Sequence, residues 1–389
     1  MPGQQWQRTE QQCQQLYHSW GIRIPDINCS YLTSAVGVVY GTSQKLAIRK
    51  EILQAVSEQY GVSVSAVDSG IRRMIDQLEA KPDEGWMQFK AESGFEAETT
   101  GLWALKRILA PRKLNTNKGS FGYLLSLCGS RGMAGAAVMS AQAASRCGVG
   151  LIDLALPESV YPAAASAIRE SVFTLLPEQE NEISISEAEA LLSGKLAHRT
   201  TACLVGCGLG TSREAQKLVE YLLARSKAPM VIDADGLNAI AAEPEMLSKA
   251  QAPLVLTPHP GEMARLLKTT VQDVQRHRLE YAKEFAVKQR LVLVLKGNKT
   301  VVACPDGKVY INTTGNPGMA KAGSGDVLAG IIGAFLAQGM APEQAAAGGV
   351  YLHGLAGDRC AERLSQIGMT APDLIEELPA LFLELTATK

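Results

Sequence analysis

A single carboxylate, Asp326, lies at the start of an apolar helix-like run and directly behind a glycine-rich segment. The segment Gly323-Ser324-Gly325 carries little side-chain bulk, so its backbone N–H groups could approach a phosphate closely. The first turn of a helix adds N–H groups without helical partners and partial positive charge, which also favour an anion. These residues therefore predict a phosphate-binding helix start with one acid beside it.

Two interpretations of Asp326 are open from this stretch alone. As a capping acid, it would stabilise the helix start by roughly 0.5–2 kcal/mol. As a base, it would align and deprotonate a substrate hydroxyl that attacks a terminal phosphate. Phosphoryl transfer depends more on positioning than on base strength, so an acid whose pKa is lowered by the helix dipole could still serve.

The run behind Asp326 has the spacing of a buried helix. Its apolar residues fall at i, i+1, i+4, i+5, i+8 and i+9, which is one continuous helical face. These residues are Val327, Leu328, Ile331, Ile332, Phe335 and Leu336.

Five other apolar runs lead into loops rich in Gly, Asp, His or Lys. They alternate with Ala-rich helical stretches, a pattern that predicts βαβ units and a mainly parallel sheet. Loops at the carboxyl ends of parallel strands line the same edge of a sheet, so their polar residues should converge. An antiparallel hairpin of Thr300–Ala303 and Lys308–Asn312 is expected at the edge of the sheet. The five runs are Leu124–Leu127, Leu204–Val205, Met230–Ile232, Leu254–Leu256 and Leu291–Leu295.

Composition indicates a globular protein that acts on a small molecule. The 389 residues are 46% hydrophobic and carry a net charge of −1, which gives a large core and no overall basic field for nucleic acid or an anionic membrane. The N-terminus lacks a signal-peptide layout and no apolar run approaches the ~20 residues of a spanning helix, so we expect a cytoplasmic protein without a membrane partner. The eight cysteines form no CxxC pair and are expected to be reduced core thiols.

The character of the chain changes near residues 80–100. Residues 1–80 show helical spacing and predict a small all-α module. Residues 81–99 are polar and contain Lys81-Pro82-Asp83-Glu84-Gly85, which indicates a linker. Residues 100–389 then form the α/β domain.

Six motifs in order carry a family resemblance over residues 100–389. They resemble the ADP/ATP-dependent NAD(P)H-hydrate dehydratases of the ribokinase-like superfamily. The resemblance implies a three-layer αβα sandwich with a mainly parallel sheet, and a homo-oligomer. The motifs are NKGSFGYLLSLCGSRGMAGAA, VGCGLG, VIDADGLNAI, LTPHPGEMARLL, VLKGNKTVVA and TGNPGMAKAGSGDVLAGIIGAFLAQG.

The same resemblance implies a lyase that repairs nicotinamide cofactors. Its substrates would be (6S)-hydrated NADH or NADPH and the co-substrate ADP or ATP, with Mg²⁺ as cofactor. The C6 hydroxyl would be phosphorylated, and loss of phosphate would restore the cofactor. By this likeness Asp326 is the base, and Glu262 orders Mg²⁺ through water.

Further site residues follow from the resemblance. The AMP portion of the nucleotide would contact Lys296, Gly297, Asn298, Lys299 and Thr300. The transferred phosphate would be held by Ala322, Gly323, Ser324 and Gly325. The hydrated dinucleotide would contact Ala136, Gly208, His259, Asn316 and Asp326, and the wall would be closed by Asp233, Asp235 and Asn238.

Each of these residues also has a structural interpretation. His259 lies between two prolines and could be a turn residue, Glu262 could be a helix-start acid, and Gly208 could serve packing. Lys296 alone could be a solvated lysine at a strand end. The chain departs from the family pattern at three positions: Asn117 replaces His, Cys207 replaces Pro, and Ser324 replaces Thr.

The N-terminal module has a shorter resemblance. The stretches YLTSAVGVVYG and LAIRKEILQAVSEQYGVSVSAVDSGIRRMI are similar to the effector domain of the sporulation-initiation response regulator. Tyr60–Ser63 would be the turn and Val64–Ile75 a recognition-like helix, with Arg72 and Arg73 available to DNA. Residues 1–90 hold nine Lys and Arg against nine Asp and Glu, so a docking or dimerisation module is favoured over DNA binding.

Two other functions fit the same residues. One is a kinase of the same fold that phosphorylates a small alcohol such as a vitamin precursor. The other is a regulator that senses a nucleotide and binds DNA or a partner through the helical module. The LTPHPGE and TGNPGMA motifs argue against the kinase, and the acid and lysine residues favour catalysis over sensing.

Overall fold

The computed structural model describes residue 13 and residues 27–40, 52–80, 98–179 and 182–387. Two compact units are present, one of Met1–Glu96 with Gly101–Trp103 and the other of Ala97–Thr100 with Ala104–Lys389. Most of the expected linker, residues 81–97, lies outside the described residues.

The described part of the first unit is helical. It contains α2 (Ile27–Tyr40), α3 (Leu53–Tyr60) and α4 (Val64–Ala80). A small core joins the three helices around Tyr31, Val56 and Val67, and an edge-to-face contact between Tyr31 and Tyr60 closes it. The all-α prediction is therefore confirmed for these residues.

A three-residue turn separates α3 from α4. Gly61 ends α3 with a φ of +67°, a left-handed conformation that glycine adopts at little cost. The Ser63 hydroxyl then accepts a hydrogen bond from Ala66 N (3.1 Å), which caps the start of α4. The helix begins at Val64 as expected and extends beyond Ile75 to Ala80.

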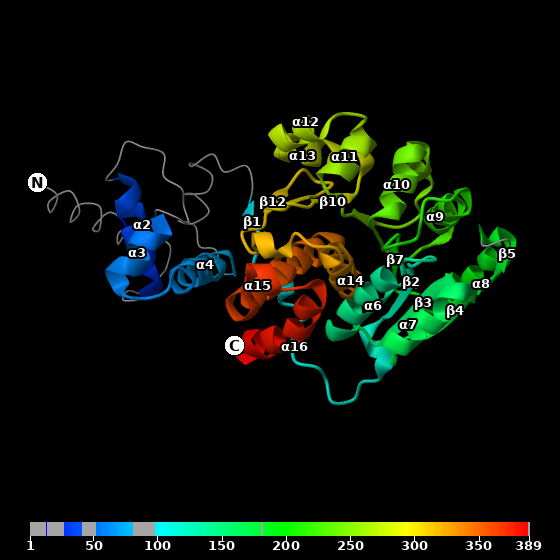
Figure 1. The fold of residues 1–389 in the computed structure, drawn as a ribbon, viewed down its shortest axis with the longest axis horizontal. Helices are drawn as coiled ribbons and strands as arrows, with labels where there is room; N and C mark the ends of the chain where they lie inside the picture. The colour runs from blue at the N-terminus through cyan, green and yellow to red at the C-terminus, as the bar shows by residue number, and fades with distance from the viewer. Residues whose placement is uncertain (1–12, 14–26, 41–51, 81–97, 180–181, 388–389) are drawn as a thin grey trace, which may run out of the picture. The chain divides into compact units, whose positions relative to one another are not determined.

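The second unit is built on a ten-stranded sheet (Figure 1). Its order is β1-β12-β11-β10-β9-β8-β7-β2-β3-β4, and β11 alone among these strands runs antiparallel to both neighbours. A separate pair, β5 and β6, is antiparallel. The strands are β1 (Glu98–Thr99), β2 (Tyr123–Leu127), β3 (Leu151–Pro157), β4 (Val172–Leu176), β5 (Glu178–Gln179), β6 (Glu182–Ile183), β7 (Ala202–Val205), β8 (Met230–Ile232), β9 (Leu254–Leu256), β10 (Val292–Leu295), β11 (Val301–Ala303) and β12 (Val309–Ile311).

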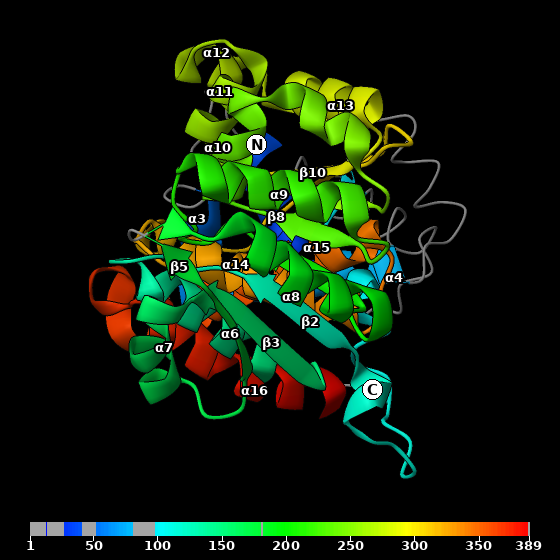
Figure 2. The same ribbon diagram turned by 90° about the vertical axis from the view of Figure 1, so that its right-hand side faces the viewer.

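Helices cover both faces of this sheet (Figure 2). One layer packs into a shared apolar core with the strands and consists of α8 (Ile185–His198), α9 (Arg213–Arg225), α10 (Asp235–Ala242), α11 (Pro260–Leu267), α12 (Val271–Arg276) and α13 (Arg278–Gln289). The other layer consists of α6 (Ala134–Arg146), α7 (Tyr161–Ala167), α14 (Ser324–Ala337), α15 (Pro342–Gly368) and α16 (Ala371–Ala387). Short 3₁₀ turns are η2 (Leu102–Leu105), η3 (Lys118–Phe121), η4 (Glu158–Val160), η5 (Pro244–Lys249) and η6 (Pro317–Met319). The three-layer prediction is confirmed.

The five expected strands are five neighbours in the sheet. They are β10, β9, β8, β7 and β2, all parallel, so their carboxyl ends form one continuous edge. The antiparallel hairpin of β11 and β12 is also confirmed.

The prediction that this hairpin forms the edge of the sheet was wrong, because β1 pairs in parallel with β12 and lies beyond it. Glu98 and Thr99, which the sequence placed in the linker, form this extra strand.

The apolar helix α14 lies in the core as predicted. Every residue from Val327 to Ala337 is buried. Gly330 faces α6 so closely that an added Cβ would lie 2.1 Å from Ser140 O, which explains a glycine in the middle of this helix. Among the described residues, no helix combines the length and apolarity that crossing a membrane requires.

Candidate active site

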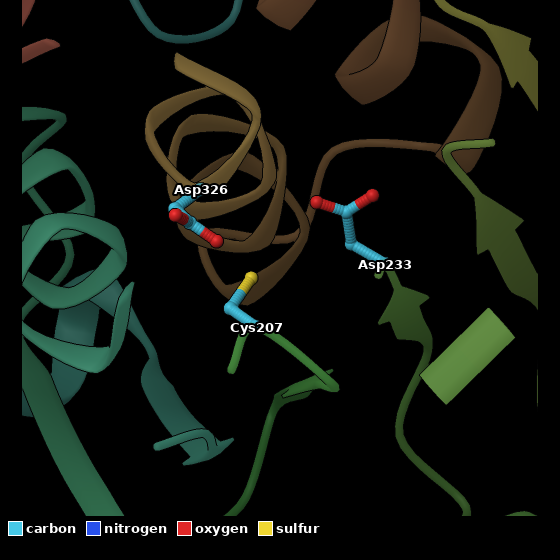
Figure 3. Close-up of side chains that lie close together, drawn as sticks. All are labelled: Cys207, Asp233 and Asp326. Atoms are coloured by element: carbon cyan, nitrogen blue, oxygen red, sulfur yellow. The ribbon is translucent and has the colours of Figure 1, made fainter. Parts of the chain in front are cut away.

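Asp326 meets two side chains from neighbouring strand ends (Figure 3). It is the third residue of α14, Asp233 directly follows β8, and Cys207 lies two residues after β7. One ligand atom from each of the three lies within 4.8 Å of the others. The acid at the helix start and the strand-end loops therefore come together as the sequence predicted.

The pKa of Asp326 is raised from 3.8 to about 6. Burial of the carboxylate is the main cause, and the nearby negative charge of Asp233 adds to it; a hydrogen bond from Cys207 and the charge of Lys296 act in the opposite direction. The expectation that the helix dipole lowers this pKa was wrong, because burial and a second acid outweigh the dipole. A carboxyl group that titrates near neutrality is well matched to proton transfer.

Lys296 links the acids of two neighbouring loops. Its ammonium donates to Asp233 Oδ1 (2.5 Å) and lies 3.9 Å from Glu262 Oε2. Thr257 Oγ1 also donates to Asp233 Oδ1 (2.8 Å). Burial alone would lower the pKa of Lys296, but Asp233 and Glu262 more than offset this and raise it, so the lysine stays charged. It is thus no solvated strand-end residue.

The start of α14 offers what a magnesium-bound phosphate needs. An added Cβ at Gly325 would lie 3.4 Å from Lys296 Nζ and 3.6 Å from Asp233 Oδ2, so an ammonium and a carboxylate oxygen flank the helix tip where glycine leaves room. N–H groups and an ammonium suit phosphate oxygens, and a carboxylate oxygen suits a hard cation. The residues therefore fit a phosphate with Mg²⁺.

The loop after β10 exposes backbone next to this tip. Gly297, Asn298 and Lys299 are exposed, and Thr300 Oγ1 donates to Gly297 O (2.9 Å). The guanidinium of Arg278 holds the start of the loop by donating hydrogen bonds to Leu295 O (2.9 Å) and Lys296 O (3.3 Å). Sequence reasoning missed Arg278, which lies on α13 and carries no local motif.

His259 and Glu262 form a capping box at the start of α11. His259 Nδ1 accepts from Gly261 N (2.9 Å) and Glu262 N (3.3 Å), and Glu262 Oε2 accepts from His259 N (2.7 Å). Burial, and then the charge of Lys296, lower the pKa of His259, so its half-exposed ring is neutral near pH 7. The structural interpretations of both residues thus describe their contacts.

Gly208 and Ala136 lie against each other. An added Cβ at Gly208 would be 2.8 Å from Ala136 Cβ and 3.0 Å from Met133 O, and the φ of Gly208 is +61°. The glycine therefore allows the loop after β7 to pack on the start of α6. This is the packing role that the sequence left open.

Asn316 is engaged within the protein. Its Oδ1 accepts from Gly318 N (2.9 Å), and its Nδ2 donates to Gly357 O (2.8 Å) and Asp358 Oδ1 (3.2 Å). These bonds pin the loop before α14 to α15. Through them Asn316 positions the glycine-rich segment.

The wall residues tie loops together. Asp235 Oδ2 accepts from Gly210 N (2.8 Å), and Asn238 Oδ1 accepts from Arg265 Nε (3.0 Å). Ala234 between the two aspartates has φ +49° and ψ −115°, a conformation that costs a residue with a Cβ roughly 1–3 kcal/mol. Backbone strain is thus stored next to Asp233.

Asn117, which stands where the family pattern has His, caps η3 by accepting a hydrogen bond from Gly119 N (2.9 Å).

A buried histidine lies behind the helix tip. His353 on α15 is 8% exposed, and its Nε2 is 3.4 Å from Ser324 Oγ. Burial lowers its pKa to about 4, so the ring is neutral and supports Ser324 without adding charge. No motif marks this residue, which is a lone histidine in an Ala- and Gly-rich run.

Comparison with known proteins places the chain in a family. The family model for NAD(P)H-hydrate dehydratase matches residues 124–380. A bifunctional NAD(P)H-hydrate repair enzyme of Moorella thermoacetica is 45% identical over 280 residues, which cover 72% of this chain and 52% of that protein. The ADP-dependent (S)-NAD(P)H-hydrate dehydratase of Neisseria meningitidis is 41% identical over 64% of this chain and 81% of its own length.

The fold comparison agrees. A crystal structure of the ADP/ATP-dependent NAD(P)H-hydrate dehydratase from Bacillus subtilis, co-crystallised with ATP and Mg²⁺, matches with a TM-score of 0.64 and 29% identity over 75% of this chain and the whole of that one. A ribokinase-like protein of Enterococcus faecalis matches with a TM-score of 0.65, which confirms the expected superfamily. The chain spans about half the length of the bifunctional relatives it matches. The chain belongs to the NAD(P)H-hydrate dehydratase family.

Proposed function

We propose that this protein uses ADP or ATP to dehydrate (6S)-hydrated NADH and NADPH back to the intact cofactors. The observation that carries this proposal is Asp326, a carboxyl group with a pKa of about 6 at a phosphate-binding helix start. The membership of the chain in the dehydratase family and its likeness to proteins named as ADP-dependent dehydratases support the choice of substrate.

Asp326 is the proposed base. Its carboxylate takes the proton of the substrate C6 hydroxyl while that oxygen attacks the terminal phosphate of the nucleotide. The C6–O bond then breaks, inorganic phosphate leaves with the bonding electrons, and loss of a proton from C5 to solvent re-forms the C5–C6 double bond of the dihydronicotinamide ring. A pKa near neutrality allows Asp326 to be ionised before the transfer and to hold the proton afterwards.

The helix start and Lys296 are proposed to hold the transferred phosphate. Backbone N–H groups of Ala322–Gly325 would donate to the phosphate oxygens, and Lys296 lies beside Gly325. Mg²⁺, when bound, neutralises phosphate charge; Asp233 Oδ2 would hold it directly or through water. Glu262 contributes through water, because its Oε2 already accepts from His259 N.

The exposed loop of residues 296–300 is proposed to bind the AMP portion of the nucleotide. Its backbone is held by Arg278 and leaves Asn298 and Lys299 open to a ligand. The half-exposed ring of His259 is proposed to contact the hydrated dinucleotide. We assign Gly208, Ala136 and Asn316 to shaping the loops around that substrate.

The test is a coupled measurement of product and phosphate. Purified protein is mixed with hydrated NADH and Mg²⁺, and ADP and ATP are added in separate reactions. With at least one of the two nucleotides we expect the NADH absorbance to return with matched phosphate release. Asp326→Ala should abolish turnover while nucleotide binding persists. Accumulation of an organic phosphate without NADH would instead identify a small-alcohol kinase.

For the first unit we propose docking or self-association rather than DNA reading. Arg72, one of two adjacent arginines on α4, donates from Nε and Nη2 to both oxygens of Asp68 (3.1 and 2.9 Å). That fork is the geometry by which arginine would otherwise grip a phosphate. Light scattering of the full chain should show an oligomer. Retention of duplex DNA at moderate salt would contradict the docking role.

A further inference from the structure

A thiol stands among the acids of the proposed site. Cys207, Asp233 and Asp326 come from three separate elements, and one ligand atom of each lies within 4.8 Å of the others (Figure 3). Cys207 is fully buried and Asp233 is 1% exposed, so two of the three are fixed by packing. The phosphoryl-transfer chemistry proposed above uses the two acids and gives the thiol no part beyond its hydrogen bond to Asp326.

The charge around these side chains favours a cation. Asp233, Asp326 and Glu262 face one ammonium, that of Lys296. Lys296 and Thr257 both bond to Asp233 Oδ1, whereas Oδ2 lies toward the tip of α14. A metal ion could therefore bind Oδ2 without displacing the lysine.

The donor set selects the type of metal. Hard ions such as Mg²⁺ bind oxygen, whereas a thiolate with carboxylates suits borderline ions such as Zn²⁺ and Co²⁺. Tetrahedral Zn²⁺ has Zn–S of about 2.3 Å and Zn–O of about 2.0–2.2 Å, so the Asp326 carboxylate must rotate to bring its oxygen toward the fixed ligand atoms of Cys207 and Asp233. Such rotations are open to Asp326, which is not fully buried.

We propose that Cys207, Asp233 and Asp326 bind a borderline divalent cation such as Zn²⁺, and that this binding takes Asp326 out of the reaction. On binding, the Cys207 thiol releases its proton to solvent and its sulfur donates an electron pair to the metal; no oxidation occurs. The metal site stands on the geometry alone. The inhibition that it causes rests on the proposed dehydratase function.

Cobalt is the probe for the site, because a bond between Co²⁺ and a thiolate gives a near-ultraviolet charge-transfer band. Metal-free full-length protein titrated with Co²⁺ should develop this band to one equivalent, and Zn²⁺ should bleach it. The band should be absent in Cys207→Ala. Cys304→Ala, which removes a buried thiol after β11, should keep it.

Asp326→Asn provides a second arm that does not depend on the folding of the cysteine variant. Loss of one carboxylate ligand should weaken Co²⁺ binding by at least about tenfold. No band in the unaltered protein, an unchanged band in Cys207→Ala, or equal Co²⁺ affinity in Asp326→Asn would each overturn the proposal.

The inhibition is measured separately as the ratio of turnover with and without Zn²⁺ at saturating Mg²⁺. This ratio should be low in the unaltered protein and closer to one in Cys207→Ala. A cobalt band in a protein without dehydratase turnover would retain the metal site and reject the proposed function. Equal ratios in both proteins would reject the inhibition.

Discussion

Replacing Asp326 by asparagine should stabilise the protein while it abolishes turnover. The pKa of Asp326 is about 6 in the folded chain against 3.8 for an ordinary aspartate, a rise of about two units. At 1.36 kcal/mol per unit, ionising this group in the folded state costs up to about 3 kcal/mol at neutral pH. Asparagine keeps the shape and an acceptor oxygen for Cys207 and carries no charge, so it removes that cost.

The sign of the effect depends on pH. Because the folded pKa is raised, the cost is absent below pH 3.8, where both states are protonated, and complete above about pH 6. Thermal unfolding of both proteins between pH 4 and 8 should therefore show a difference in Tm that grows from near zero to about 6–12 °C for the full cost, at about 2–4 °C per kcal/mol.

The control for this experiment is Asp306→Asn. Hydrogen bonds from Lys308 lower the pKa of Asp306, which lies exposed in the β11–β12 turn, so this change should give no stabilisation at neutral pH. An Asp326→Asn protein that is less stable than the parent at pH 7, or a difference that is the same at pH 4 and pH 7, would refute the reasoning.

Four further predictions follow from the site. The value of kcat/KM should fall as pH drops through about 6, where Asp326 becomes protonated, and pH–rate profiles measure this. Lys296→Met should cost about 3–5 kcal/mol of stability by leaving Asp233 and Glu262 unpaired, and should move the acidic limb to higher pH, because Lys296 lowers the pKa of Asp326. Gly325→Ala should fold normally, since its Cβ makes ordinary contacts, but should raise the nucleotide KM on the order of tenfold by weakening one charged hydrogen bond. Ala234→Gly should raise the urea midpoint by relieving strain, a net gain of about 1 kcal/mol after the entropy cost of glycine.

Much of the fold could be predicted because its signals are local. The apolar runs of β2 and β7–β10 are short and bounded by glycine or polar loops, and α14 has an unbroken helical face. Strand β1 has only two residues in a polar stretch, so nothing local marks it; its pairing with Tyr310 and Ile311 fixes it. Strand pairing between distant segments is the information that periodicity lacks.

The site was predictable to a different degree. Motif order pointed to Asp326, Lys296 and the glycine-rich tip, which lie close together in the structure because each follows a strand end or starts a helix at the same edge of the sheet. The support of Ser324 by His353 and of the loop by Arg278 could not be predicted, because these side chains reach across from other helices. Residues that act by supporting another residue need not belong to any motif, so the sequence around them does not mark them.

The two interpretations of Asp326 can be separated by energetics. A capping acid is stabilised by N–H groups and the helix dipole, so its pKa should fall. In the structure the N-cap, Gly323, has no side chain to cap with, and the pKa of Asp326 rises because the group is buried beside Asp233. The acid therefore opposes folding at neutral pH, which argues against the capping interpretation and favours the proposed role as base. If Asp326→Asn leaves both stability and turnover unchanged, neither interpretation describes this residue.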